Sequence, residues 1–133
     1  MVTPFEFATA AHILFGEGKV REAPAAAAAM GRRALLVTGV PPELAAPLVA
    51  GLQAAGVACV PLAVTGEPTI EMVRRGNEYA RAERCDLVIG MGGGSAMDAG
   101  KALAAMLANP GDPLDYLEVI GRGQPLGHAS APF

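Results

Sequence analysis

The sequence lacks an excess of basic charge, a long apolar run and a basic segment of the signal-peptide kind in its first residues, and each absence argues against a class of protein. Ten Lys and Arg residues against 13 Asp and Glu give a net charge of −3, so no positive field would attract nucleic acid or an anionic membrane surface. No segment reaches the ~18 uninterrupted apolar residues of a membrane-spanning helix. The first residues, MVTPFEF, have no basic region of the kind that begins a signal peptide. A cytoplasmic protein without nucleic-acid or membrane partners is therefore expected.

Cysteine and histidine are scarce, and tryptophan is absent. Cys59 and Cys85 lie far apart and form no CxxC pair, which indicates two buried thiols in a reducing cytosol and neither a disulfide nor a metal site. His12 and His128 stand near opposite ends of the chain, away from any group of carboxylates. Because no metal-ligand spacing and no Ser-His-Asp or Cys-His arrangement is present, we predict no catalytic residue and no metal ligand in this chain.

What the sequence contains is a regular alternation of short apolar runs and helical segments. Hydrophobic residues make up 52% of the 133 positions, which is enough for one domain with a real core. The alternation predicts an α/β fold of the Rossmann-like kind, a parallel sheet with helices on both faces. Gly31 is expected to end the first helix as a C-terminal glycine. The expected strands are 34–38, 57–64 and 86–90, and the expected helices are 20–30, 41–55, 70–83, 95–109 and a short one within 113–120.

One stretch, DLVIGMGGGSAMDAGKALAAMLAN at 86–109, combines a buried strand, a glycine turn and an apolar helix. Gly92, Gly93 and Gly94 remove the side chains from the turn. Ser95 is expected to open the helix, with Asp98 at the spacing of a capping box. Glycines let a ligand approach the main chain closely, and the first N–H groups of a helix are available to bind it. Phosphate is the expected occupant.

The glycine run alone does not specify a known phosphate motif. The third glycine of the GxGxxG pattern is replaced by Ser95 or Met97, and a P-loop is excluded because Gly100-Lys101 is followed by Ala102. A strand-to-helix turn that needs only a positive φ is the alternative. Four glycines, Gly90 and the run 92–94, exceed what such a turn requires. This excess favours a phosphate-binding turn at the carboxyl end of a parallel strand.

The segment GMGGGSAMDAGKA at 90–102 resembles the GGGSxxDxAK signature of the iron-containing, metal-dependent alcohol dehydrogenases. Four further segments fall in that family's order and spacing, so the resemblance covers nearly the whole chain. They are HILFGEG at 12–18, RRALLVTG at 32–39, GEPTIEMV at 66–73 and DYLEVIGRGQPL at 115–126. Gly100 departs from the family, in which alanine is usual. With this resemblance, residues 5–15 are expected to form an edge strand or hairpin, and 131–133 to begin the next core strand.

The resemblance implies a site for NAD or NADP. The N–H groups of residues 92–95 would bind the diphosphate, and Asp98 would lie beside the cofactor. Glu67 falls where the family has a polar residue near the adenosine half, often Asn. Gly39 replaces an Asp that is frequent in the family, where it bonds the ribose hydroxyls and repels a 2′-phosphate, so we expect NADP to be tolerated. The predicted cofactor-binding residues are Gly39, Glu67, Gly92, Gly93, Gly94, Ser95 and Asp98.

The resemblance also implies a larger enzyme. Residues 1–133 would be its N-terminal dinucleotide-binding domain, and a helical domain beyond Phe133 would supply one Asp and three His to a divalent metal, Fe or Zn. That metal would polarise an alcohol or carbonyl oxygen, and hydride would pass between the same carbon and the nicotinamide. The expected substrates are alcohols, aldehydes or ketoacids, including those of the maleylacetate reductase branch. A homo-oligomer is expected, and the 133 residues alone are expected to be inactive.

Two other interpretations stay open. A lyase akin to 3-dehydroquinate synthase would share the fold and use NAD only transiently, although the serine of GGGS and the DxGK continuation favour the dehydrogenase. A non-catalytic nucleotide-binding module would need no metal ligands. Net formation of NAD(P)H from simple alcohols would separate the dehydrogenase from the lyase.

Overall fold

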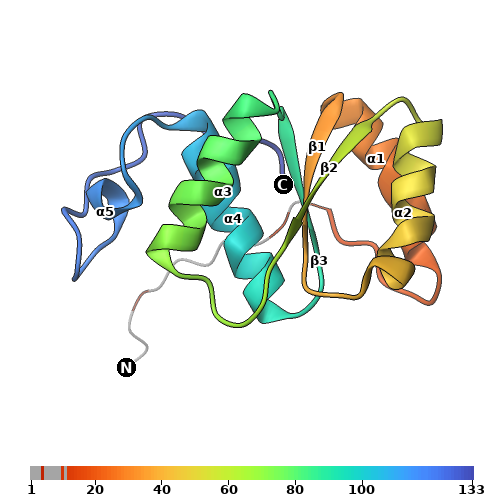
Figure 1. Cartoon of the computed structure of the whole chain (residues 1–133), viewed down its shortest axis with the longest axis horizontal. Coiled ribbons are helices and arrows are strands. Elements are labelled where there is room, and N and C mark those ends of the chain that lie inside the picture. Colours follow the sequence, from red (N-terminus) through yellow and green to blue (C-terminus); the bar gives the residue numbers. More distant parts are fainter. Residues whose placement is uncertain (1–3, 5–9, 11) are drawn as a thin grey trace.

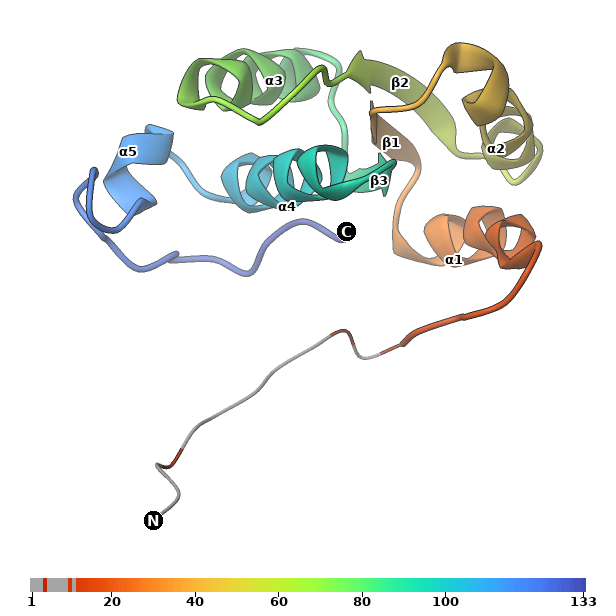
Figure 2. The ribbon, with the colours of Figure 1, turned by 90° about the horizontal axis from the view of Figure 1, so that it is seen from below.

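The chain folds into three layers in the computed structural model, which describes residues 4, 10 and 12–133 (Figure 1). Within these residues, a sheet of three parallel strands forms the middle layer, and it consists of β1 (Arg33–Thr38), β2 (Ala58–Ala63) and β3 (Leu87–Met91). The helices α1 (Ala23–Met30) and α2 (Pro42–Ala54) cover one face, and α3 (Ile70–Ala82) and α4 (Gly94–Ala108) cover the other (Figure 2). A 3₁₀ turn, η1 (Lys19–Glu22), precedes α1, and the short α5 (Pro113–Tyr116) follows α4. The predicted α/β fold with helices on both faces is confirmed.

The apolar run of β1 explains why both faces of the sheet are covered. Successive side chains of a strand point to opposite faces, and a strand that is buried on both faces is apolar at every position. One core lies under α3 and α4, and the other lies under α1 and α2. The first includes Leu35, Val37, Val60, Val88 and Leu103, and the second includes Ala34, Leu36, Leu48, Leu52 and Leu87.

The strand order is β2-β1-β3, with β1 in the centre. Leu36 of β1 stands opposite Pro61 of β2 on one side and Ile89 of β3 on the other. The chain therefore leaves β1 through α2 to reach one side of the sheet, and crosses back through α3 to reach the other. The direction of winding reverses between β1 and β3. In open α/β sheets, ligands bind at such a reversal, outside the carboxyl ends of the strands.

Gly31 ends α1 in a way that the sequence did not predict. Its φ and ψ are −173° and −171°, which is extended backbone and not the left-handed conformation of a C-terminal glycine. A β-carbon on Gly31 would lie 2.5 Å from Oδ1 of Asp86. That carboxylate accepts hydrogen bonds from the N–H groups of Arg32 at 2.9 Å and Arg33 at 2.8 Å. A glycine is needed at 31 because a side chain there would displace Asp86, the residue before β3, from its hydrogen bonds to the start of β1.

The prediction of an edge strand or hairpin over 5–15 is wrong for the part that the structure describes. Residues 5–9 and 11 lie outside the described residues, and residues 12–15 have no regular secondary structure. The edge of β3 is instead met by the segment 131–133. The N–H of Val88 donates to the carbonyl oxygen of Pro132 at 2.9 Å, and the N–H of Ala131 donates to that of Ala104 at 2.9 Å.

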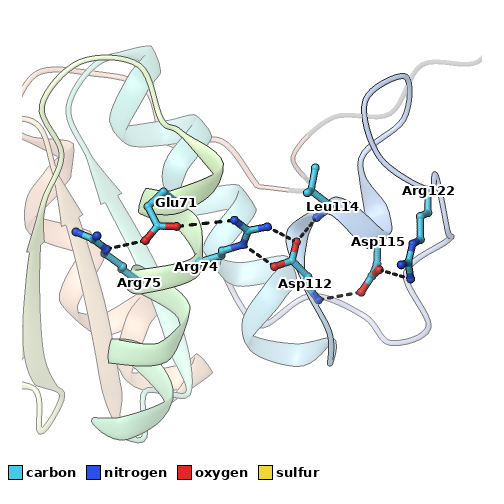
Figure 3. A network of polar contacts seen from close by, with 7 residues as sticks. All are labelled: Glu71, Arg74, Arg75, Asp112, Leu114, Asp115 and Arg122. Carbon is cyan, nitrogen blue, oxygen red and sulfur yellow. Dashed lines mark hydrogen bonds and ion pairs between the residues drawn. The ribbon is translucent and has the colours of Figure 1, made fainter.

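A chain of ion pairs attaches α5 to α3 (Figure 3). The guanidinium of Arg74 donates to both carboxylate oxygens of Asp112, from Nε at 2.5 Å and from Nη2 at 2.9 Å. Asp112 also caps α5 by accepting from the N–H of Leu114, and Asp115 completes a capping box by accepting from the N–H of Asp112, each at 2.9 Å. The hydrogen bond from Arg74 lowers the pKa of Asp112 below its ordinary value of 3.8. The helix predicted within 113–120 is thus present but only one turn long, Pro113–Tyr116. The capping box formed by Asp112 and Asp115 stabilises it.

Candidate functional site

The carboxyl ends of β1 and β3 meet at two glycines. The N–H of Gly39 donates to the carbonyl oxygen of Met91 at 3.0 Å. Gly92 has a φ of +146°, and a β-carbon on it would lie 3.2 Å from the nitrogen of Gly39 and 3.1 Å from the β-carbon of Ala96. Gly92 is therefore required both by its backbone conformation and by the lack of space around it. This single residue accounts for the positive φ that a simple strand-to-helix turn would need.

Gly93 and Gly94 are not required by the packing of the protein. Gly93 has φ −82° and ψ −165°, which other residues adopt readily. At both positions a β-carbon would meet no atom within 4 Å, and both residues are exposed. Side chains at 93 and 94 would fit the fold, so these glycines keep open a space in front of the turn that the fold itself does not use.

The first turn of α4 faces this space with unbonded N–H groups. The helix starts at Gly94 with Gly93 as its N-cap, and no side chain of the described residues caps it. The N–H of Met97 donates to the carbonyl oxygen of Gly93 at 3.1 Å, and the N–H groups of residues 94–96 precede this first helical bond. The positive end of the helix dipole lies at the same place. The arrangement suits an anion with several oxygen acceptors.

Ser95 and Asp98 do not form the predicted capping box. Ser95 is the second residue of α4 and not its N-cap, because the helix already begins at Gly94. Its hydroxyl donates to Oε1 of Glu67 at 3.4 Å. Asp98 lies beyond the first turn, where its carboxylate is 66% exposed and stands 3.9 Å from Nζ of Lys101. The structure thus brings Ser95 to Glu67 and Asp98 to Lys101.

The loop after β2 carries Glu67 to the start of α4. The N–H of Val64 donates to the carbonyl oxygen of Thr38 at 2.8 Å, and the carbonyl oxygen of Val64 lies 3.8 Å from the position of a β-carbon on Gly39. Three residues later the exposed side chain of Glu67 reaches Ser95. The ends of all three strands therefore contribute to one region, and six of the seven predicted residues lie in or beside it; Asp98 is one turn further along α4.

Gly39 is replaceable without strain. It is exposed, and a β-carbon there would make ordinary contacts, 3.5 Å from the β-carbon of Ala96 and 3.8 Å from the carbonyl oxygen of Val64. A β-carbon therefore fits at the end of β1. The glycine leaves this edge of the region without a side chain and without a charge.

Ala96 has a role that was not predicted from the sequence. This residue is 1% exposed, and its β-carbon lies close to both strand ends, 3.5 Å and 3.1 Å from the β-carbon positions of Gly39 and Gly92. A larger side chain would push α4 away from the sheet. The available signal was a small residue in the first turn of a helix that follows a strand-end glycine, a position at which close helix–strand packing is usual.

The structure also explains the departure from the family pattern at Gly100. The ring of Phe133 lies over two glycines, with Cε2 at 2.5 Å from the position of a β-carbon on Gly100 and 3.1 Å from that on Gly90. Alanine at position 100 would collide with the ring. The glycine thus makes room for the segment that meets the edge of β3.

The described residues do not meet the requirements of a metal site, a membrane-spanning helix or a disulfide. Residues 4, 10 and 12–133 contain no group of three His, Cys, Asp or Glu side chains that could hold a metal ion, so these residues do not fit an iron or zinc centre. No helix in this range is long and apolar enough to cross a membrane. Cys59 and Cys85 are free thiols, and burial raises the pKa of each.

The chain matches known proteins along most of its length. A family model described as "Iron-containing alcohol dehydrogenase" matches residues 10–133. Choline dehydrogenase of Bacillus subtilis is 33% identical over 126 residues, which cover 91% of this chain and 31% of that protein. Sulfoacetaldehyde reductase of Bilophila wadsworthia is 34% identical over 114 residues, which cover 80% of this chain and 29% of that protein.

Solved structures agree with the sequence comparison. A mutant of an archaeal halo-thermophilic alcohol dehydrogenase from a Red Sea brine pool matches with a TM-score of 0.80 and 27% identity, over 93% of this chain and 34% of that one. Sulfoacetaldehyde reductase from Bifidobacterium kashiwanohense, solved in complex with NAD+, matches with a TM-score of 0.68 and 28% identity. The match covers 88% of this chain and 32% of that one. The chain spans about a third of the length of the relatives that it matches.

Proposed function

Because this chain belongs to the iron-containing alcohol dehydrogenase family, we propose that it is the dinucleotide-binding domain of a metal-dependent dehydrogenase or reductase. The observation that carries the proposal is the open space at the point where the sheet reverses its winding. Gly93 and Gly94 keep that space free although neither is required by the fold, and the unbonded N–H groups of α4 face it. A diphosphate has the charge and the number of oxygen acceptors that such a turn binds.

The binding roles in this proposal follow from the positions of the residues. The N–H groups of Gly94, Ser95 and the next residue donate to the diphosphate, while Gly92 lets β3 turn sharply into α4. Asp98 lies one turn away, and the family motif is what supports its place beside the cofactor. The bound dinucleotide supplies the nicotinamide carbon that accepts or returns a hydride. The NAD+ in the related sulfoacetaldehyde reductase supports a nicotinamide cofactor.

We propose further that NADP is accepted as well as NAD. A 2′-phosphate near the end of β1 would meet no carboxylate at Gly39, whose β-carbon position has only ordinary contacts. Titration of the chain with NADH and NADPH, followed by nicotinamide fluorescence, tests this. Dissociation constants within about tenfold of each other (about 1.4 kcal/mol) are expected, and a strong preference for NADH would overturn it.

For the whole protein, we propose a cytoplasmic homo-oligomer that interconverts small alcohols with aldehydes or ketones, or reduces ketoacids. The catalytic metal, iron or zinc, would be held by residues that correspond to the two thirds of the relatives that this chain does not match. The 133 residues alone should therefore bind the dinucleotide without turning it over. The relatives named above are dehydrogenases and reductases, so no observation favours the lyase related to 3-dehydroquinate synthase.

Calorimetric titration of the purified chain with NADH tests the proposed function. Saturable binding of one NADH per chain, with inorganic pyrophosphate as a competitor, is the expected result. Competition by pyrophosphate is required because it carries the diphosphate charge without the nucleoside. Failure to bind NADH at millimolar concentration would overturn the proposal.

A further inference from the structure

We propose that Glu67 weakens the affinity of the glycine turn for its dinucleotide by placing a negative charge beside the diphosphate site. This inference rests on the function proposed above and concerns the strength of binding at the same site. The observation behind it is the hydrogen bond from the hydroxyl of Ser95 to Oε1 of Glu67, at 3.4 Å. Ser95 is the second residue of α4, so its own N–H is one of the unbonded groups that would bind the anion.

The carboxylate stands close to the place where a phosphate would bind. A phosphate oxygen that accepts from the N–H of Ser95 lies about 3 Å from that nitrogen. The hydroxyl of the same residue is already in contact with Glu67. The two negative groups would therefore lie on either side of one serine residue, at a separation comparable to the Debye length of ~8 Å at physiological salt.

The Ser95 hydroxyl can serve only one of these acceptors. A serine hydroxyl carries a single proton, and in the structure it is directed at Glu67. A bound diphosphate either takes this hydrogen bond from Glu67 or binds without it. In both cases the carboxylate opposes the anion, since like charges repel across a solvated gap.

Among the described residues, no basic side chain forms an ion pair with Glu67. The acid four positions later is different: Glu71 pairs with Arg75 at 2.8 Å and with Arg74 at 3.8 Å. Glu67 therefore has no ion-pair partner among the described residues, whereas Glu71 has two and lies in the first turn of α3. This contrast makes Glu71 the matched control.

The exposed position of Glu67 decides how its charge acts. A charge at the rim of a binding site changes mainly the association rate of a charged ligand and the salt dependence of binding. Glu67 should thus slow the approach of the anionic dinucleotide, and its effect should decline as salt screens the repulsion.

The test measures the dissociation constant of NADH for four versions of the full chain, unsubstituted, Glu67→Gln, Glu67→Asp and Glu71→Gln. At low ionic strength, Glu67→Gln should bind about three- to tenfold more tightly than the unsubstituted chain, and this gain should shrink in about 0.5 M salt. Glu67→Asp keeps the charge and Glu71→Gln removes a compensated one, so both should stay within about twofold of the unsubstituted chain.

The sign of the change separates the possible outcomes. Weaker binding by Glu67→Gln would mean that the carboxylate is itself a cofactor contact, and an unchanged constant at low salt would mean that its charge is not felt. Either result, with NADH still bound by the unsubstituted chain, overturns this inference alone. If no version binds NADH, the proposed function is overturned and this inference with it.

Discussion

The N–H of Gly39 donates to the carbonyl oxygen of Met91 at 3.0 Å and so joins the ends of β1 and β3 where the winding of the sheet reverses. The next residue after Met91 has the one positive φ of the turn, +146° at Gly92. A ligand held by the start of α4 must therefore also lie beside the end of β1. Substitutions at Gly39, at Gly92 and at the two glycines after it can therefore test the contribution of each position to folding and to binding.

Gly94→Ala should separate folding from binding. The β-carbon would meet no protein atom within 4 Å, and alanine in place of glycine in a helix stabilises by up to about 1 kcal/mol. The same methyl group would enter the space proposed for the diphosphate, so NADH binding should weaken by about tenfold or more. Urea denaturation and an NADH titration of the same preparation measure both effects.

Gly92→Ala is the contrasting variant, since it should lower both stability and binding. Its positive φ and the 3.2 Å approach to the nitrogen of Gly39 should cost about 1–3 kcal/mol of unfolding free energy. Gly127→Ala, where a β-carbon meets nothing within 4 Å, serves as the neutral control. Equal stability of the variants at positions 92 and 127 would contradict the requirement for glycine at the strand end.

Gly39→Asp should change the choice of cofactor without harming the fold. The aspartate fits because its β-carbon would have ordinary contacts of 3.5 and 3.8 Å. Its charge should oppose a 2′-phosphate, so NADPH binding should weaken by about tenfold or more while NADH binding is kept. Gly39→Asn, which has the same size and no charge, should leave NADPH binding close to that of the unsubstituted chain. If both substitutions weaken NADPH equally, bulk and not charge governs this position.

The strands and the glycine turn could be predicted from sequence because both are local signals. A run such as residues 34–38 is apolar at every position, which is what burial on both faces of a parallel sheet demands. Three consecutive glycines occur in one place, where β3 turns into α4. Helix α3 begins at Ile70, as the expected range 70–83 has it, and the hydroxyl of Thr69 caps it by accepting from the N–H of Met72 at 3.1 Å.

The predictions that were wrong, and the contacts that were not predicted, depend on residues distant in sequence. Position 31 must lack a side chain because Asp86, 55 positions later, and Leu87 occupy the space. Ser95 does not cap α4 because Gly93 is the N-cap residue. The hydroxyl of Ser95 instead donates to Glu67, which lies in the loop after β2. No periodic pattern in the sequence indicates either contact, because each one forms only through the strand order β2-β1-β3.

The packing of Phe133 on Gly100 predicts a coupled pair of substitutions. In the unsubstituted chain, Gly100→Ala should gain little or lose stability, because the ring at 2.5 Å must move away from the new methyl group. In a Phe133→Ala background the same change should stabilise α4 by about 1 kcal/mol, the usual helical advantage of alanine. Urea denaturation of the four versions gives the coupling energy, and strict additivity would show that the two residues do not touch.

The pairing of Arg74 with Asp112 predicts a low carboxyl pKa. The hydrogen bond from Arg74 lowers the pKa of Asp112 below 3.8. Because the folded value lies below the unfolded one, the pair stabilises the attachment of α5 above about pH 4, and this stabilisation is lost as the pH falls through the folded value. Carbon NMR of the Asp112 carboxyl should show a midpoint below 3.8.

Substitution on α3 provides the control for that titration. Arg74→Gln should return the midpoint of Asp112 to its ordinary range. Arg75→Gln should leave it unchanged, because Arg75 is 79% exposed and pairs with Glu71 at 2.8 Å. A midpoint that does not respond to Arg74→Gln would mean that the ion pair is not formed in solution.

The central claim, that the main-chain N–H groups at the start of α4 bind a diphosphate, is tested most directly by NMR of the ¹⁵N-labelled chain during titration with NADH. If these N–H groups bind the diphosphate, the amide signals of Gly94, Ser95 and Ala96 should shift the most, and inorganic pyrophosphate should shift the same signals. NADH binding that leaves these three amide signals unchanged would show that the diphosphate is not held there.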